Sequence, residues 1–157
     1  MISFYLISKL KKIAFFYILK DINEYHNSVC QIIKQYYKRE YKIVVVTDED
    51  DLIEQIDSNL WKFEQISFIP HTTYKKIDLT APIILCKKNK IPENYVNSDF
   101  EVLINLSNNF PEDYEKYKII IEFVLPDENM KKKSRDHYIK YKKYNYEIIH
   151  EEIIANG

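Results

Sequence analysis

The sequence KIVVVT, residues 42–47, is the clearest indication of the fold class of this chain. Its central residues Ile43 to Val46 are all β-branched and apolar, a pattern typical of a strand buried on both faces of a parallel sheet. A potential capping threonine and four acidic residues follow, and then apolar residues at helical spacing, which predicts a helix that begins among the acids. A buried strand followed directly by a helix is the building unit of α/β folds.

Further strands and helices are predicted on both sides of this unit. The expected strands are 13–19, 82–86, 100–106, 118–124 and 146–149; the expected helices are 22–39, a short one within 111–117, and 126–143. Residues 60–71 have poor periodicity and predict an irregular but packed segment. Strands and helices that alternate over short connections predict a single-domain, three-layer α/β/α fold with a mostly parallel sheet. The domain is expected over 13–157, with residues 1–12 as an N-terminal extension.

Composition limits the function classes. The chain has 157 residues, 46% of them apolar, and a net charge of −1, which suits one globular domain. Its single glycine is Gly157. Loops that hold phosphates in P-loop and dinucleotide-binding proteins need glycines where the backbone approaches the ligand. We therefore expect a sheet like that of a nucleotide-binding fold but without the glycine-rich loop, and no cofactor.

Cysteine use and hydropathy predict the compartment. Cys30 and Cys86 lie in apolar segments without metal-ligand spacing, as expected of buried thiols in a reducing cytoplasm. The longest uncharged apolar run near the N-terminus, 13–19, is far shorter than the roughly 20 residues that span a bilayer. A cytoplasmic protein without a membrane partner is expected.

Two readings remain open for the acidic cluster Asp48, Glu49, Asp50 and Asp51. Acids after a buried strand could hold Mg²⁺ in a phosphohydrolase that uses Asp48, Asp50 and Asp51. The favoured reading is that they cap a helix and complement its dipole, because no second predicted strand ends in a carboxylate. The four histidines are scattered and no serine lies in a nucleophile elbow. No catalytic residue is therefore predicted.

An aromatic concentration lies at Trp61, Phe63 and Phe68. Trp61 is the only tryptophan of the chain. Such residues either pack in the core or form a hydrophobic docking patch, and tryptophan in an irregular segment is a frequent interface anchor.

A basic segment lies at 131–143, where seven lysines and arginines face one acid, Asp136. On a helix, Lys131, Arg135, Tyr138 and Lys142 share one face at spacings of four, three and four. Tyrosine beside arginine and lysine suits an acidic ligand with an apolar tip. A solvated lysine face and direct nucleic-acid binding are the alternatives, the second weakly supported by one short patch.

Several stretches together resemble the chi subunit family of bacterial DNA polymerase III. The resemblance covers about 13–149, in order, and is carried by FYIL at 16–19, LW at 60–61 with SFIPH at 67–71, API at 81–83, LINLS at 103–107, and RDHY at 135–138 followed by Tyr141 and YNY at 144–146. Two departures are Ile139, where the family often has a basic residue, and Asn145, where a turn glycine is usual.

The resemblance implies a non-enzymatic clamp-loader accessory protein. One surface, at the matching positions Trp61 and Phe68, would bind the psi subunit. Another, at Lys131, Arg135 and Tyr138, would bind the acidic C-terminal tail of single-stranded DNA-binding protein, so that DNA is contacted only indirectly. Helical spacing suggests that Lys142 supplies the charge missing at Ile139. An alternative is a stand-alone adaptor that joins single-stranded DNA-binding protein to a helicase or another partner on the Trp61 side.

Overall fold

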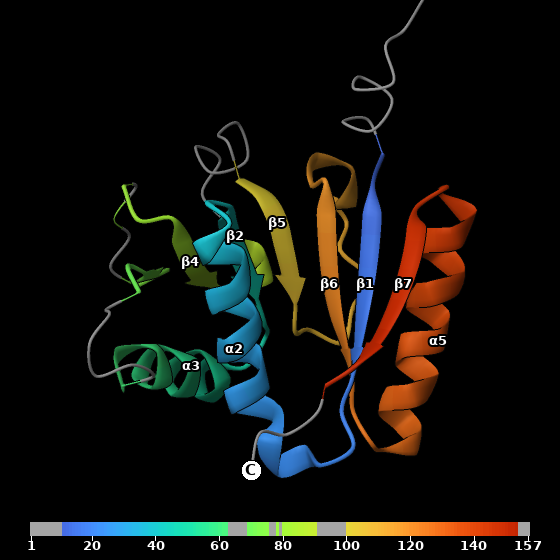
Figure 1. Cartoon of the computed structure of the whole chain (residues 1–157), viewed down its shortest axis with the longest axis horizontal. Coiled ribbons are helices and arrows are strands. Elements are labelled where there is room, and N and C mark those ends of the chain that lie inside the picture. The colour runs from blue at the N-terminus through green and yellow to red at the C-terminus, as the bar shows by residue number, and fades with distance from the viewer. Residues whose placement is uncertain (1–10, 63–68, 76–77, 79, 91–99, 154–157) are drawn as a thin grey trace, which may run out of the picture.

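A computed structural model describes residues 11–62, 69–75, 78, 80–90 and 100–153 of the chain (Figure 1). Seven strands form one sheet in the order β3-β4-β2-β5-β6-β1-β7, and every neighbouring pair is parallel. The strands are β1 (Ile13–Ile18), β2 (Lys42–Val46), β3 (Thr72–Thr73), β4 (Ile83–Cys86), β5 (Phe100–Asn105), β6 (Ile119–Val124) and β7 (Glu147–Glu152). The predicted α/β class is confirmed.

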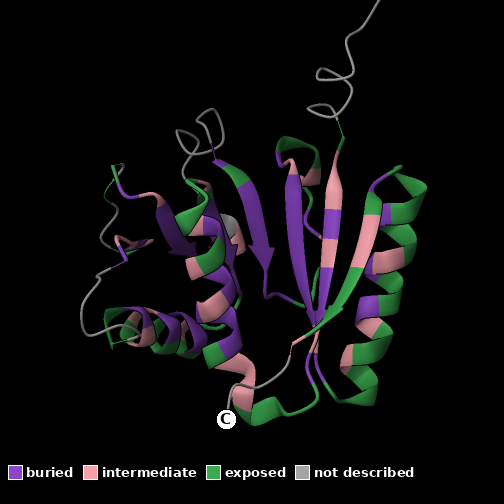
Figure 2. Cartoon of the chain, in the orientation of Figure 1, coloured by how far each residue is buried: buried purple, intermediate pink, exposed green. Residues whose placement is uncertain are grey.

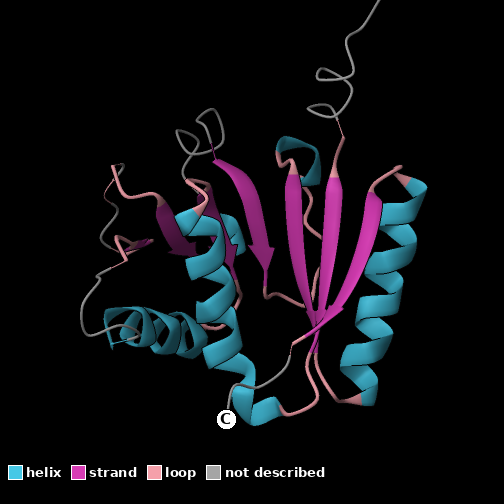
Figure 3. Cartoon of the chain, viewed as in Figure 1, coloured by secondary structure: helices cyan, strands magenta, loops and turns pink. Residues whose placement is uncertain are grey.

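The helices that connect these strands are α2 (Tyr25–Lys38), α3 (Asp50–Lys62) and α5 (Glu128–Lys143), with 3₁₀ turns η1 (Ile22–Glu24), η2 (Lys88–Lys90) and η3 (Tyr114–Lys116) (Figure 3). Strand β2 lies in the sheet interior, where Val44 is in register with Ile84 of β4 and Leu103 of β5. Its apolar residues are buried, as a strand covered on both faces requires (Figure 2).

The three layers, helices on both sides of the sheet, are held together by two apolar cores, one on each face of the sheet. Helices α2 and α3 pack on one face of the sheet, in a cluster that includes Tyr17, Ile33 and Ile56. Helix α5 packs on the other face, where Tyr141 and Phe16 belong to a second cluster. Phe16 and Tyr17 are neighbours in β1 and point to opposite faces, as successive residues of a strand do.

Some local expectations need correction. Helix α3 continues to Lys62, so Trp61 lies in a helix rather than an irregular segment. Apolar spacing predicted one helix over 22–39, but a 3₁₀ turn capped by Asp21 precedes α2. The last strand extends to Glu152, and the short β3 was not predicted. Residues 1–10 of the predicted extension, and Phe63 and Phe68, lie outside the described residues.

Helices α2 and α5 end in the same way. Glu40 and Asn145 adopt positive φ angles of 67° and 64°. The following amides, of Tyr41 and Tyr146, donate to the carbonyl oxygens of Tyr36 and Tyr141. This is the Schellman arrangement, which glycine usually supplies. Asn145, which stands where the family usually has glycine, therefore still adopts the left-handed conformation of the turn that leads from α5 into β7.

Candidate functional site

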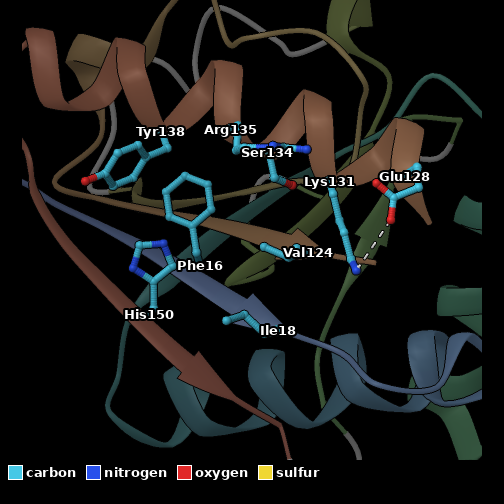
Figure 4. A pocket seen from close by; sticks show the side chains of 9 residues that line it. All are labelled: Phe16, Ile18, Val124, Glu128, Lys131, Ser134, Arg135, Tyr138 and His150. Carbon is cyan, nitrogen blue, oxygen red and sulfur yellow. Dashed lines mark ion pairs between the residues drawn. The ribbon is translucent and has the colours of Figure 1, made fainter. Parts of the chain in front are cut away.

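One flank of helix α5 and the sheet beneath it enclose a cavity of about 540 Å³, here called the α5 pocket (Figure 4). Its lining residues are Phe16 and Ile18 of β1, Val124 of β6, His150 of β7, and Glu128, Lys131, Ser134, Arg135 and Tyr138 of α5. Three of the four residues predicted from helical spacing, Lys131, Arg135 and Tyr138, thus share one cavity.

The sheet provides the apolar floor of the α5 pocket. Phe16, Ile18 and Val124 belong to β1 and β6, which are neighbours in the sheet and end side by side. Helix α5 begins directly after this edge, where Asp127 caps it by accepting a hydrogen bond from the amide of Met130 (3.2 Å). The cap fixes the first turn of α5, and the helical repeat then places Arg135 and Tyr138 over the floor.

Cations line the helix side of the α5 pocket. Lys131 is half-exposed and its Nζ lies 3.9 Å from a carboxylate oxygen of Glu128, a surface pair that constrains it weakly. The side chain of Arg135 is exposed on the same flank. A binding partner with negative charge would therefore meet two cations above an apolar surface.

An aromatic group closes one end of the pocket. The rings of Phe16 and His150 stack with centroids 5.4 Å apart, and Tyr138 lies 6.3 Å from Phe16 and 5.6 Å from His150. Lys142 adjoins this group: its Nζ lies 3.5 Å from the Tyr138 hydroxyl and 5.7 Å from the ring centroid. Lys142 therefore contacts Tyr138 at the rim and does not line the cavity itself.

Ser134 is a further polar residue in the pocket wall. Its Oγ is buried and, among the described residues, is the one buried side-chain polar atom without a hydrogen-bond partner. Such a group calls for a partner that the protein itself does not supply. The lining residues Phe16, Ile18, Val124 and His150 were not predicted from the sequence, because they lie on strands of the sheet and not on α5.

A buried polar network beneath α5 holds the helix in place. Glu122, fully buried in β6, accepts hydrogen bonds from the Tyr141 hydroxyl (2.7 Å), the Nδ1 of His137 (2.9 Å) and the Nδ2 of Asn105 (3.1 Å). Burial is the main cause that raises the pKa of Tyr141 well above its ordinary value, so this hydroxyl remains a donor. Helical spacing puts Ser134, His137 and Tyr141 on the face of α5 toward the sheet, and all three are buried, whereas Tyr144, which follows at the same spacing, is 43% exposed.

Trp61 lies far from this helix, near the end of α3, and is 59% exposed. Its ring packs edge-on against His71 at 5.4 Å. His71 is fixed by contacts to the Asp57 carboxylate (2.7 Å) and the Ile69 carbonyl oxygen (2.8 Å). Of the two predictions for Trp61, core packing is wrong, and an exposed aromatic surface is what the structure has.

The acidic cluster has partners within the protein. Asp50 accepts a hydrogen bond from the Tyr74 hydroxyl (2.6 Å) and pairs with Lys87 (2.9 Å), and these two contacts lower the pKa of its carboxyl group. The amide of Glu49 donates to Thr47 Oγ1 just before α3 begins, and Asp50 and Asp51 lie in the first turn of the helix, where acids complement the helix dipole. Across the described part of the chain, no group of three or more His, Cys, Asp or Glu side chains could hold a metal ion, and no helix there is long and apolar enough to cross a membrane.

Two comparisons of the sequence with known proteins find the same family. The model of the family described as "DNA polymerase III chi subunit, HolC" matches residues 10–149. The DNA polymerase III subunit chi of Haemophilus influenzae is 25% identical over 132 residues, which cover 82% of this chain and 89% of that protein.

A similar solved structure is "Mss116p DEAD-box helicase domain 2 bound to an RNA duplex", with a TM-score of 0.62 and 14% identity. The match covers 91% of this chain but only 64% of the helicase chain. At this identity the likeness shows a shared fold and nothing more.

Proposed function

The chain belongs to the DNA polymerase III chi subunit family, and we propose that it is a non-catalytic adaptor of the replication machinery. In this proposal it links the clamp loader, through the psi subunit, to the acidic C-terminal tail of single-stranded DNA-binding protein. The proposal places its work in the cytoplasm and assigns no catalytic residue and no cofactor. The observation that supports it most is the α5 pocket, which joins two cations to an apolar floor.

Arg135 is the residue proposed to bind the terminal carboxylate of the tail. A guanidinium can donate two parallel hydrogen bonds to a carboxylate, an interaction worth about 1.5–3 kcal/mol. Lys131 would attract the acidic side chains that precede the last residue, and the Glu128 pair would not prevent this because it is weak and exposed. Lys142 extends the positive charge along the same flank.

The apolar end of the tail would lie on the floor of the pocket. Phe16, Ile18 and Val124 offer apolar side chains there, and Tyr138 packs edge-on to Phe16 at one end. The unsatisfied Oγ of Ser134 is a nearby polar group that a peptide or an ordered water could satisfy. A contact of this size predicts affinity on the order of micromolar and a marked loss with salt.

The psi subunit is proposed to bind the surface at Trp61, with Phe68 as a second contact. Trp61 is a large aromatic residue that remains 59% exposed at the end of a helix, and exposed tryptophans are frequent anchors of protein interfaces. This surface lies on α3 and the α5 pocket on the opposite face of the sheet, so one chain can bind both partners at once (Figure 1). The same exposure would serve a helicase or another partner, and a pull-down that recovers such a protein but no psi would favour the stand-alone adaptor.

A fluorescence-anisotropy titration tests the tail-binding half of the proposal. The ligand is an acidic peptide with the sequence of the tail, made once with a free C-terminal carboxylate and once as the amide. The free acid should bind in a salt-dependent way. The amide should bind at least about tenfold more weakly, because the two parallel hydrogen bonds from the Arg135 guanidinium require a carboxylate. Equal binding of both peptides, or of neither, would contradict the proposal.

A further inference from the structure

Helix α5 has a second flank that the proposed adaptor function leaves unused. Lys133, Lys140 and Tyr144 lie along it and face the segment that follows β5. Helix α5 and that segment enclose a second cavity, of about 460 Å³, lined by Asn108, Asn109, Phe110, Asn129, Met130, Lys132, Lys133, Asp136, His137 and Lys140. Tyr144 lies beyond this lining. We call Lys132, Lys133, Lys140, Phe110, Tyr114 and Tyr144 the basic-aromatic flank.

The cavity is suited to an anion. Three lysines line it against one carboxylate, that of Asp136, and three asparagine residues add amide groups able to donate hydrogen bonds. Lys133 is half-buried, and its Nζ donates to the Ser107 carbonyl oxygen at 3.4 Å. An anion in the cavity would give this partly desolvated ammonium a charged partner.

An aromatic stack adjoins the cavity. The rings of Tyr114 and Tyr144 lie 4.7 Å apart and nearly parallel, at 20°. Phe110 contacts both, at 5.4 Å and 6.2 Å, and also forms part of the cavity wall. The Nζ of Lys140 lies 5.2 Å from the Phe110 centroid, so a cation stands at the junction of cavity and stack.

Cations that track a phosphate backbone beside aromatic rings that stack bases are the two components of single-strand binding sites. We propose that the basic-aromatic flank binds single-stranded DNA directly, with a phosphate in the cavity and a base on the Tyr114–Tyr144 stack. The family resemblance implies only indirect contact with DNA, and one short basic patch in the sequence was weak support for direct binding. The tyrosine stack, which the helix and a segment some 30 residues earlier build together, is the added observation.

The site is distinct from the α5 pocket. Lys131, Arg135 and Tyr138 line that pocket, whereas Lys132, Lys133 and Lys140 line the second cavity. One helix would thus carry the protein tail on one flank and the strand on the other. The proposal does not depend on tail binding, and either site can fail alone.

An NMR titration of the whole chain with oligothymidylate of about 15 nucleotides, near the largest site sizes of single-strand-binding domains, locates the site. At about 50 mM salt, shift changes should concentrate on 107–116 and on Lys132, Lys133, Lys140 and Tyr144. The logarithm of the binding constant should fall with the logarithm of the salt concentration, with a slope of about −1.4 to −2.1 for two to three phosphates. Shift changes confined to the α5 pocket, or no binding, would overturn the proposal.

Two further ligands distinguish base stacking from phosphate binding at the proposed site. An abasic strand of equal length should bind at least about fivefold more weakly, because it offers phosphates without bases to stack. A duplex should also bind more weakly, since its bases are already stacked and paired. If inorganic phosphate shifts the same residues but the oligonucleotide does not bind, the cavity is an anion site only and the proposal is wrong.

Paired variants complete the test. Lys140→Glu should weaken oligonucleotide binding at least about tenfold, whereas Lys142→Glu, the same charge change on the other flank, should weaken it less than about threefold. Tyr144→Ala should weaken binding at least about fivefold and Tyr144→Phe should restore it. Equal losses from Lys140→Glu and Lys142→Glu would mean general charge attraction and would refute the site. The chemical-shift dispersion of each variant shows whether it has folded.

Discussion

The carboxylate of Glu122 lies 2.9 Å from the Nδ1 of His137, in a part of the molecule where both side chains are almost completely buried. This contact joins the strand β6 to the helix α5, and the Tyr141 hydroxyl adds a second link to the same carboxylate. Both proposed ligand sites lie on α5, so their geometry depends on this network.

Removal of the buried carboxylate should destabilise the fold. Glu122→Ala leaves three donors without their acceptor, and we expect it to lower the free energy of unfolding by about 3 kcal/mol or more. Tyr141→Phe removes a single hydroxyl and should cost about 1–2 kcal/mol. Urea unfolding followed by circular dichroism measures both, and a loss below about 1 kcal/mol for Glu122→Ala would mean that the network does not hold α5.

Replacement of Arg135 tests the proposed carboxylate fork. Arg135→Ala should weaken binding of the free-acid tail peptide by about tenfold or more. Arg135→Lys keeps the charge but cannot donate two parallel hydrogen bonds, so its affinity for the peptide should lie between those of the wild type and Arg135→Ala. Because the side chain is exposed, the thermal unfolding midpoint should change little. Unchanged peptide affinity in Arg135→Ala would exclude Arg135 from the site. Lys132→Ala, which removes a cation outside the α5 pocket, is the matched control.

Trp61→Ala tests the proposed docking surface on α3. The substitution should impair binding of the psi subunit and leave tail-peptide affinity unchanged, because Trp61 is exposed and the α5 pocket lies across the sheet. Co-purification with psi and anisotropy with the peptide provide the two readouts. Simultaneous loss of both activities would indicate a folding defect instead of a local contact.

The two cysteines should be inert in the native protein. Burial raises the pKa of Cys30 and of Cys86 to about 12, and both side chains have no exposed surface. A thiol reagent at about pH 8 should therefore modify neither until denaturant is added, since the thiolate is the reactive form. Because the native pKa values lie above those of the unfolded chain, the contribution of the two cysteines to stability should be constant below about pH 8.5 and fall as the pH rises above it. Fast modification of the folded chain would contradict this burial.

Much of the fold could be predicted because its signals are local. Residues 42–47 carry a buried strand in their own composition, and the period of 3.6 residues alone puts Lys131, Arg135 and Tyr138 on one flank of a helix. Prediction failed where the residues show no clear period. The two-residue β3 was missed, and the end of α3 was misjudged because Trp61 in its last turn belongs to a run of poor periodicity in the sequence. Glu122 could have been noticed as the one acid in an otherwise apolar strand.

The alternation of strands and helices, and the helix face that carries Lys131, Arg135 and Tyr138, can be read from the sequence alone, since both follow from spacings of a few residues. What this face of α5 packs against depends on the tertiary fold. Phe16 and His150 are 134 positions apart, yet they are paired in register across β1 and β7 because α5 crosses over the sheet to place β7 beside the first strand. The same folding brings Tyr114 against Tyr144. Such contacts arise from the order of strands in the sheet, which no local spacing contains.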